Sequence, residues 1–149
     1  YSEIKKIRDV RQFTGILYGL SFVGVALFFT MMLGGDFTDC MVAGIAGLAM
    51  AVTQWVLTPF GFNSFFLNMI STLSMALTAV GFKKFFLPGI NIDLVIIGGI
   101  MPIVPGVVFT TAMRDTLNGD YTAGVSRMLE TGVVAFAVAV GVALAYVIL

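Results

Sequence analysis

The sequence predicts an all-α polytopic membrane protein, a bundle of about five transmembrane helices with a broken fourth helix. Of its 149 residues, 59% are hydrophobic and only 11% are charged, whereas soluble domains are about half apolar and roughly a quarter charged. An unusually apolar soluble helical protein is the alternative, but a core of this chain length would not hide so much apolar surface. The apolar runs do not alternate with polar residues, as β-barrel strands would.

The chain begins with a basic segment, residues 1–12, in which Lys5, Lys6, Arg8 and Arg11 cluster ahead of a long uncharged run. Basic residues beside a membrane span favour the cytoplasmic side, so we expect a cytoplasmic N-terminus. A nucleic-acid-binding patch is disfavoured, because no basic stripe with interleaved aromatic residues follows. Since the first residue is Tyr1 rather than Met, we expect this N-terminal region to be truncated.

Residues 13–149 are predicted to form the membrane domain. The uncharged runs are residues 12–35, 40–82, 94–113 and 131–149. A membrane helix needs about 20 residues, so the second run is long enough for two spans, and "TPFGFN" at 58–63 supplies the turn between them. We expect Asn118-Gly119 to end one helix and Asp120 to cap the next.

If the chain crosses the membrane five times from a cytoplasmic N-terminus, the turns at 58–63 and 114–127 lie in the cytoplasm. The turns at 34–39 and 83–93 then lie outside. Six of the eight basic residues then lie on the cytoplasmic side, as the distribution of positive charge in membrane proteins requires. Lys83 and Lys84 are the exceptions. A re-entrant fourth segment would change this parity and is the alternative.

Small residues recur every four positions on three predicted helices. These stripes are Gly15-x-x-x-Gly19, Ala43-x-x-x-Gly47-x-x-x-Ala51 and Ala137-x-x-x-Gly141-x-x-x-Ala145. Small residues allow the backbones of membrane helices to approach closely. The stripes therefore predict helix packing rather than a binding site.

The fourth span contains "MPIVPG" at residues 101–106. Proline has no N–H, so Pro102 and Pro105 would leave the carbonyls of Gly98 and Met101 without helical donors. At about 1.5 Å per residue, about 12 Å of helix lies before Pro102 and about 13 Å after Pro105, which places the break near the middle of a core about 30 Å thick. We expect residues 102–106 to be non-helical. A simple proline kink is the alternative.

Broken helices at membrane depth hold substrates or ions in transporters, so the break is the candidate binding site. Polar side chains near it lie on the third helix (Asn68, Ser71, Thr72, Ser74, Thr78), on the second (Thr53, Gln54) and after the break (Thr110, Thr111). Individually such hydroxyls often bond to their own helix, but together they suggest an internal polar path. The candidate substrate-binding residues are Gly98, Met101, Pro102, Pro105, Gly106, Val107, Thr110, Asn68 and Thr72.

Charged residues follow the break closely, and the candidates for coupling or gating are Arg114, Asp115, Asp120, Arg127 and Glu130. Arg127 and Glu130 are three residues apart on one helix face and could pair. Glu130 is then an interfacial anchor, or it is buried and carries a proton; the sequence leaves both open. No P-loop occurs, which favours a secondary transporter over a nucleotide-driven pump.

Enzymatic chemistry finds little support in the composition. The chain has one cysteine, Cys40, and no histidine, which excludes most thiol, zinc and Ser-His chemistry. We therefore expect no metal, no cofactor and no catalytic residue. Two Gly-Asp pairs resemble part of an intramembrane aspartyl protease motif, but the rest of that motif is missing. An intramembrane enzyme or a non-transporting scaffold is the alternative from another functional class.

The segment "MPIVPGVVFTTAMRDTLNGDYTAGVSRMLE", residues 101–130, resembles the signature of the threonine/serine exporter family. There a P-x-x-P-G break leads into R-D, then G-D, then G-x-x-R. The matching residues are Pro102, Pro105, Gly106, Arg114, Asp115, Gly119, Asp120, Gly124 and Arg127. The five-span layout agrees with that family over essentially the whole chain.

The resemblance implies export of small amino acids such as threonine and serine across the bacterial inner (cell) membrane. Some relatives are linked to dicarboxylate export, which is the alternative. The resemblance also implies a second membrane half, fused or separate, that is related to this one as an inverted repeat. The expected partners are therefore the substrate, the lipid bilayer and that second half. A second copy of the chain is the alternative partner. The family also has a longer, polar N-terminal region, of which we expect residues 1–12 to be the remaining part.

The two substrate classes differ in the charge that the site must neutralise. A zwitterion can place its carboxylate on the N–H groups of residues 106–108 and its ammonium on the carbonyls of residues 98–101. A dicarboxylate needs a further cation, so Arg114 or Arg127 would have to reach inward. Neither lies clearly at the middle of the membrane, which favours the zwitterion.

Overall fold

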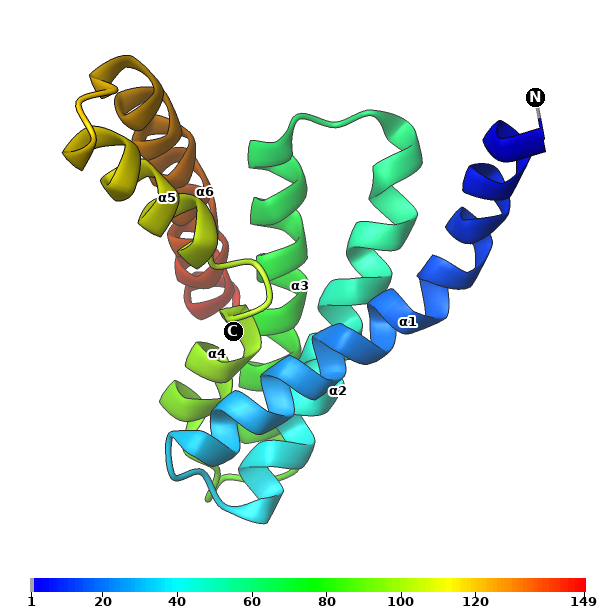
Figure 1. The fold of residues 1–149 in the computed structure, drawn as a ribbon. Helices are drawn as coiled ribbons and strands as arrows, with labels where there is room; N and C mark the ends of the chain where they lie inside the picture. The colour runs from blue at the N-terminus through cyan, green and yellow to red at the C-terminus, as the bar shows by residue number, and fades with distance from the viewer. Residues whose placement is uncertain (1) are drawn as a thin grey trace.

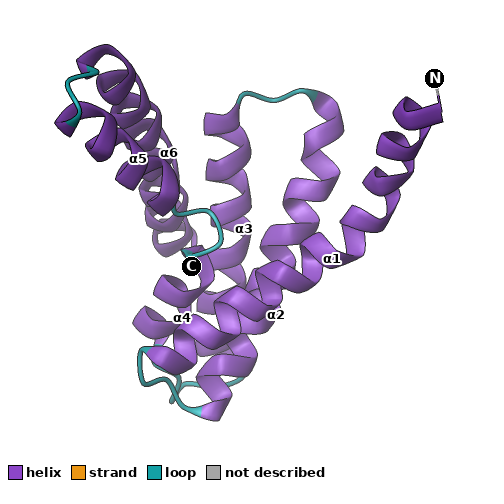
Figure 2. Cartoon of the chain, in the orientation of Figure 1, coloured by secondary structure: helices purple, strands orange, loops and turns teal. Residues whose placement is uncertain are grey.

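The computed structural model describes the backbone of residues 2–149 and the side chains of residues 17–149. Its elements are α1 (Ser2–Met32), α2 (Phe37–Leu57), the 3-10 turn η1 (Thr58–Phe60), α3 (Ser64–Phe85), α4 (Ile92–Ile100), α5 (Gly106–Leu117) and α6 (Tyr121–Ile148). The described part of the chain contains helices and loops but no strand, as Figure 2 shows. The predicted all-α class is confirmed. The basic cluster at Lys5–Arg11 and the small residue Gly15 lie outside the residues whose side chains are described.

α1, α2 and α3 run back and forth between two ends of the molecule, α4 and α5 together run back again, and α6 returns (Figure 1). The α1–α2 turn and the α3–α4 loop lie at one end, and the turns at 58–63 and 118–120 lie at the other, with the N-terminus. This alternation is the one expected from the sequence. Which end faces the cytoplasm stays a prediction.

Among the described residues, three helices are long and apolar enough to cross a membrane: α2 together with η1, α3, and α6. Residues 17–32 of α1 form a shorter apolar helix. The predicted fourth span is divided between α4, with 9 residues, and α5, with 12. The five-span domain stays a prediction, while the six-helix layout with three long apolar members fits the predicted membrane bundle.

The core is built where small residues let helix backbones meet. A Cβ on Gly47 of α2 would lie 3.0 Å from both Ala26 Cβ and Phe22 O of α1. A Cβ on Gly141 of α6 would lie 2.6 Å from Met69 O of α3. The other small residues of these two stripes are also buried. The predicted role of both stripes in helix packing is confirmed.

Candidate functional site

The helix is interrupted between α4 and α5, since α4 ends at Ile100 and α5 begins at Gly106. The break therefore comprises residues 101–105, and the expectation that Gly106 is non-helical was wrong. Pro105 occupies the N-cap position of α5. The first residues of a helix need no helical acceptor for their N–H groups, so Gly106 can start the new helix directly after the proline.

The carbonyl groups before the break are only partly satisfied. Pro102 deprives Gly98 O of its helical donor, as predicted, but the N–H of Met101 donates to this carbonyl instead, at 3.3 Å. The chain tightens here into a bond between residues three apart, as helix ends commonly do. Ile103 and Val104 both donate to Ile100 O, at 3.0 and 3.2 Å. Among the described residues, no backbone donor reaches the carbonyls of Gly99, Met101, Pro102 and Ile103.

The N–H groups after the break show the complementary pattern. Gly106 N donates to Val104 O at 2.8 Å, and the first bond of the regular helix runs from Phe109 N to Pro105 O at 2.9 Å. Within the described structure, the N–H groups of Val107 and Val108 have no backbone acceptor. Free donors at a helix start attract a negative charge, so the break separates free acceptors from free donors.

An apolar groove of about 510 Å³ borders the break on the side of α6. Its lining residues are Ile96 and Ile100 of α4, Val104 and Pro105 of the break, and Ala135, Val138, Ala139, Val142 and Ala143 of α6. The groove thus connects the break with a part of α6 far away in the sequence.

The polar side chains that were predicted to lie near the break do not all lie there. Thr110 Oγ1 donates to Val107 O at 3.0 Å, one turn from the break. Thr72 is buried and donates to Asn68 O at 2.8 Å, and its Cβ would lie 3.0 Å from a Cβ on Gly141 of α6. Asn68 Oδ1 accepts from Gln54 Nε2 of α2 at 3.5 Å. Thr72 and Asn68 therefore contact α6 and α2, and the structure gives them no polar contact with the break.

Polar side chains instead join α1, α2 and α3. Thr53 Oγ1 lies 2.8 Å from Ser74 Oγ. The hydroxyl of Tyr18 on α1 donates to Gln54 Oε1, a contact that the sequence did not predict. Tyr18 and Gln54 are 36 residues apart, and their meeting depends on how α1 crosses α2, which no local pattern encodes.

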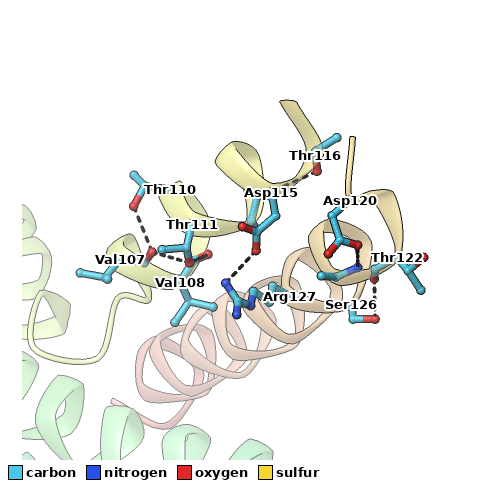
Figure 3. A network of polar contacts seen from close by, with 12 residues as sticks. Val107, Val108, Thr110, Thr111, Asp115, Thr116, Asp120, Thr122, Ser126 and Arg127 are labelled. Atoms are coloured by element: carbon cyan, nitrogen blue, oxygen red, sulfur yellow. Dashed lines mark hydrogen bonds and ion pairs between the residues drawn. The ribbon is translucent and has the colours of Figure 1, made fainter. Parts of the chain in front are cut away.

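The charged residues after the break gather on the hairpin of α5 and α6, shown in Figure 3. Arg127 Nη1 donates to Asp115 Oδ2 at 2.7 Å. The expected pairing of Arg127 with Glu130 was wrong, because α5 lies close enough to offer a carboxylate across the hairpin. Glu130 and Arg114 are exposed.

The close approach of α5 to α6 depends on Gly124. A Cβ there would contact the Thr116 hydroxyl and lie 3.0 Å from Ala112 O. The turn itself uses Gly119, whose φ of +90° suits glycine, and Asp120, whose Oδ1 accepts from Ala123 N at 3.2 Å. The predicted helix end at residues 118–119 and the cap at Asp120 are confirmed. Most of the R-D, G-D and G-x-x-R motif thus builds this hairpin.

A buried acid at the opposite end was not singled out from the sequence. Asp39 is only 4% exposed. Its Oδ1 accepts from Asn91 N at 3.0 Å and its Oδ2 from Asp36 N at 3.2 Å. The carboxylate therefore ties the start of α2 to the residue before α4. Among the described side chains, no three Cys, Asp or Glu residues are grouped as a metal site would require.

Long apolar helices that pack through small residues indicate a helical membrane protein. The model of the ThrE family, described as "Putative threonine/serine exporter", matches residues 1–149. The chain belongs to this threonine/serine exporter family, which is a family of membrane transporters. Comparison with curated proteins and with solved structures found no match.

Proposed function

We propose that the chain is the transport subunit of a secondary exporter of small amino acids such as threonine and serine. The substrate is held at the break between α4 and α5. One observation carries this proposal: residues 101–105 interrupt the helix and leave carbonyls without backbone donors beside the free N–H groups of Val107 and Val108. Membership of the exporter family supports the same class of substrate.

The arrangement suits a zwitterion. The substrate carboxylate accepts from the N–H groups of Val107 and Val108, where the positive end of the α5 dipole adds to the attraction. The substrate ammonium donates to the carbonyls of Gly99 and Met101, which have no backbone donor among the described residues. The bound molecule thus supplies hydrogen-bond partners to backbone groups that have none at the break.

Dicarboxylate export is less well supported by the positions of the cations. Arg127 already donates to Asp115. Arg114 lies eight residues beyond Gly106, or about 12 Å along the helix. A second carboxylate at the break would therefore lack a cation from this part of the chain.

The proposal includes the setting of the transporter. A second membrane half completes the substrate path, the protein lies in the bacterial inner membrane, and its N-terminus is cytoplasmic. Efflux is coupled to protons or to ion exchange, with Glu130 as the coupling carboxylate and Arg114, Asp115, Asp120 and Arg127 as gating residues. The lipid bilayer and the substrate are the remaining partners.

The test restores the missing backbone donors. In the double variant Pro102→Ala/Pro105→Ala, a continuous helix would occupy the proposed binding groups itself. Hydrogen bonds to charged groups are each worth about 1.5–3 kcal/mol, so threonine efflux should fall at least about tenfold. Labelled threonine, serine and succinate are followed from cells producing the full transporter, with protein levels matched by immunoblot.

The chain supplies matched controls in its two other prolines, Pro59 in η1 and Pro88 in the α3–α4 loop. Pro59→Ala and Pro88→Ala should retain efflux. Wild-type export by the double variant would reject the break as the binding site. Export of succinate without threonine by the unmodified protein would replace the proposed substrate by the dicarboxylate.

A further inference from the structure

The helix α6 packs against two different partners along its length. Its first part contacts α5: Gly124 adjoins Ala112 and Thr116, and Arg127 pairs with Asp115 at 2.7 Å. These contacts hold α5 and residues 121–131 together as one hairpin. In Figure 1 this hairpin stands beside α3 and away from α1 and α2.

The second part of α6 belongs to the rest of the molecule. Ala137, Gly141 and Ala145 are buried, and a Cβ on Gly141 would lie 2.6 Å from Met69 O of α3. The ring of Phe136 stacks on that of Phe65 of α3 with centroids 6.2 Å apart. This part of α6 is therefore fixed to α3.

Gly132 lies between these two regions, and no packing contact explains it. It is exposed within α6, and a Cβ placed on it would meet nothing within 4 Å. By contrast, Gly124 and Gly141 each sit against a neighbouring helix. Glycine weakens a helix relative to alanine, so Gly132 makes α6 easiest to bend at the junction of its two packing regions.

The other end of the hairpin is joined to the rest of the chain only through the break. α5 joins α4 through the non-helical residues 101–105, and among the described helices its packing partner is α6. The groove of about 510 Å³ separates α4 from α6 beside Pro105. A helix break, a weak point in α6 and open space between them lie around the same hairpin.

We propose that residues 106–131 form a rigid arm that swings about two hinges, the break at 101–105 and Gly132. The arm moves relative to a body made of α1–α4 and residues 133–149. Its swing shifts the hinge residues Val104 and Pro105, which border the groove, and so opens and closes access to the break. This role in access rests on the proposed function, whereas the motion itself does not.

The motion is measured as the distance between two spin labels attached to introduced cysteines. The labels are placed on the full transporter in lipid nanodiscs, and Cys40→Ala removes the native cysteine of this chain. Leu117→Cys with Phe60→Cys joins arm and body. In the second pair, Leu117→Cys with Leu129→Cys, both labels lie in the arm. In the third pair, Phe60→Cys with Val147→Cys, both labels lie in the body. All four label positions are exposed. We expect two populations for the first pair and a single narrow distance for the other two.

The hinge is tested by Gly132→Ala, with Gly81→Ala in α3 as the matched control, because a Cβ at Gly81 also meets nothing within 4 Å. Replacing glycine by alanine inside a helix should reduce the bent population roughly two- to fivefold, and Gly81→Ala should leave it unchanged. A single arm–body distance in the unmodified protein, broad distances in all three pairs, or equal effects of the two alanine variants would each overturn the proposal.

Efflux measured on the same variants separates the two proposals. If Gly132→Ala reduces the bent population in the arm–body distance distribution and also slows threonine efflux, the arm takes part in transport. If the distances behave as expected but the unmodified protein exports no threonine, the hinge stands and the proposed substrate is rejected.

Discussion

Gly98 on α4 lies directly against Thr30 on α1, with backbone meeting backbone. A Cβ on Gly98 would contact the Thr30 hydroxyl and would lie 2.9 Å from Thr30 N and 3.0 Å from Ala26 O. The Thr30 hydroxyl itself donates to Ala26 O at 2.8 Å. The half-helix before the break is therefore fixed to α1 through a glycine that leaves no room for a side chain.

Substituting Gly98→Ala should destabilise the protein, because the added methyl group must push α4 away from α1. Overpacking of this kind typically costs about 1–3 kcal/mol, which lowers the thermal midpoint of a chain of this size by several degrees. The midpoint is measured in detergent by differential scanning fluorimetry. Gly81→Ala, which meets open space, is the control, and an equal midpoint for the two variants would contradict the close contact.

Removing the buried carboxylate in Asp39→Ala should loosen the connection between α2 and the loop before α4. The N–H groups of Asn91 and Asp36 would lose their acceptor, at a cost of about 1–3 kcal/mol. Asp39→Asn keeps one oxygen in place and should cost less. The exposed Asp93 supplies the control Asp93→Ala, and thermal midpoints that rank Asp39→Asn below Asp39→Ala would refute the anchoring role.

The helix break was predictable because its cause is local. Pro102 and Pro105 cannot donate, and this holds wherever the segment lies in space. The same applies to the turn at Gly119 and the cap at Asp120, which depend on neighbouring residues alone. Sequence reasoning therefore located the break to within one residue at either end.

Contacts between helices were harder to predict, because they depend on crossing angles that no local pattern contains. Arg127 pairs with Asp115 on a neighbouring helix rather than with Glu130 on the same helix. The break residue Met101 formed a tighter turn and satisfied Gly98, which proline chemistry alone does not reveal. Asp39 is buried and accepts from Asn91 N, a contact between residues 52 positions apart that no local pattern predicts.

The orientation in the membrane is open to a direct test. Phe37 and Asn118 are exposed at opposite ends of the bundle, and we expect position 37 outside and position 118 in the cytoplasm. Single cysteines at these positions, in a Cys40→Ala background, are labelled in intact cells with a membrane-impermeant maleimide. Label at 118 in intact cells, with 37 protected until the cells are opened, would invert the proposed topology.

Coupling is tested at Glu130, which is exposed in this chain and has no ion pair among the described residues. The Glu130→Gln variant should remove efflux driven by a proton gradient while leaving threonine exchange largely intact, because an amide cannot carry the proton. Both modes are measured in proteoliposomes, with Asp36→Asn as the control. Unchanged proton-driven efflux in Glu130→Gln would place the coupling group elsewhere.

The short half-helices also constrain how the protein is made. α4 and α5 contain 9 and 12 residues, or about 14 and 18 Å of helix, and neither can cross a hydrocarbon core about 30 Å thick. Each alone would leave unpaired backbone groups in lipid, which is strongly unfavourable. The two half-helices can therefore span the bilayer only together. α4 packs against α1, α2 and α3, whereas α5 has α6 as its packing partner among the described helices, so α5 is covered only once α6 is in place.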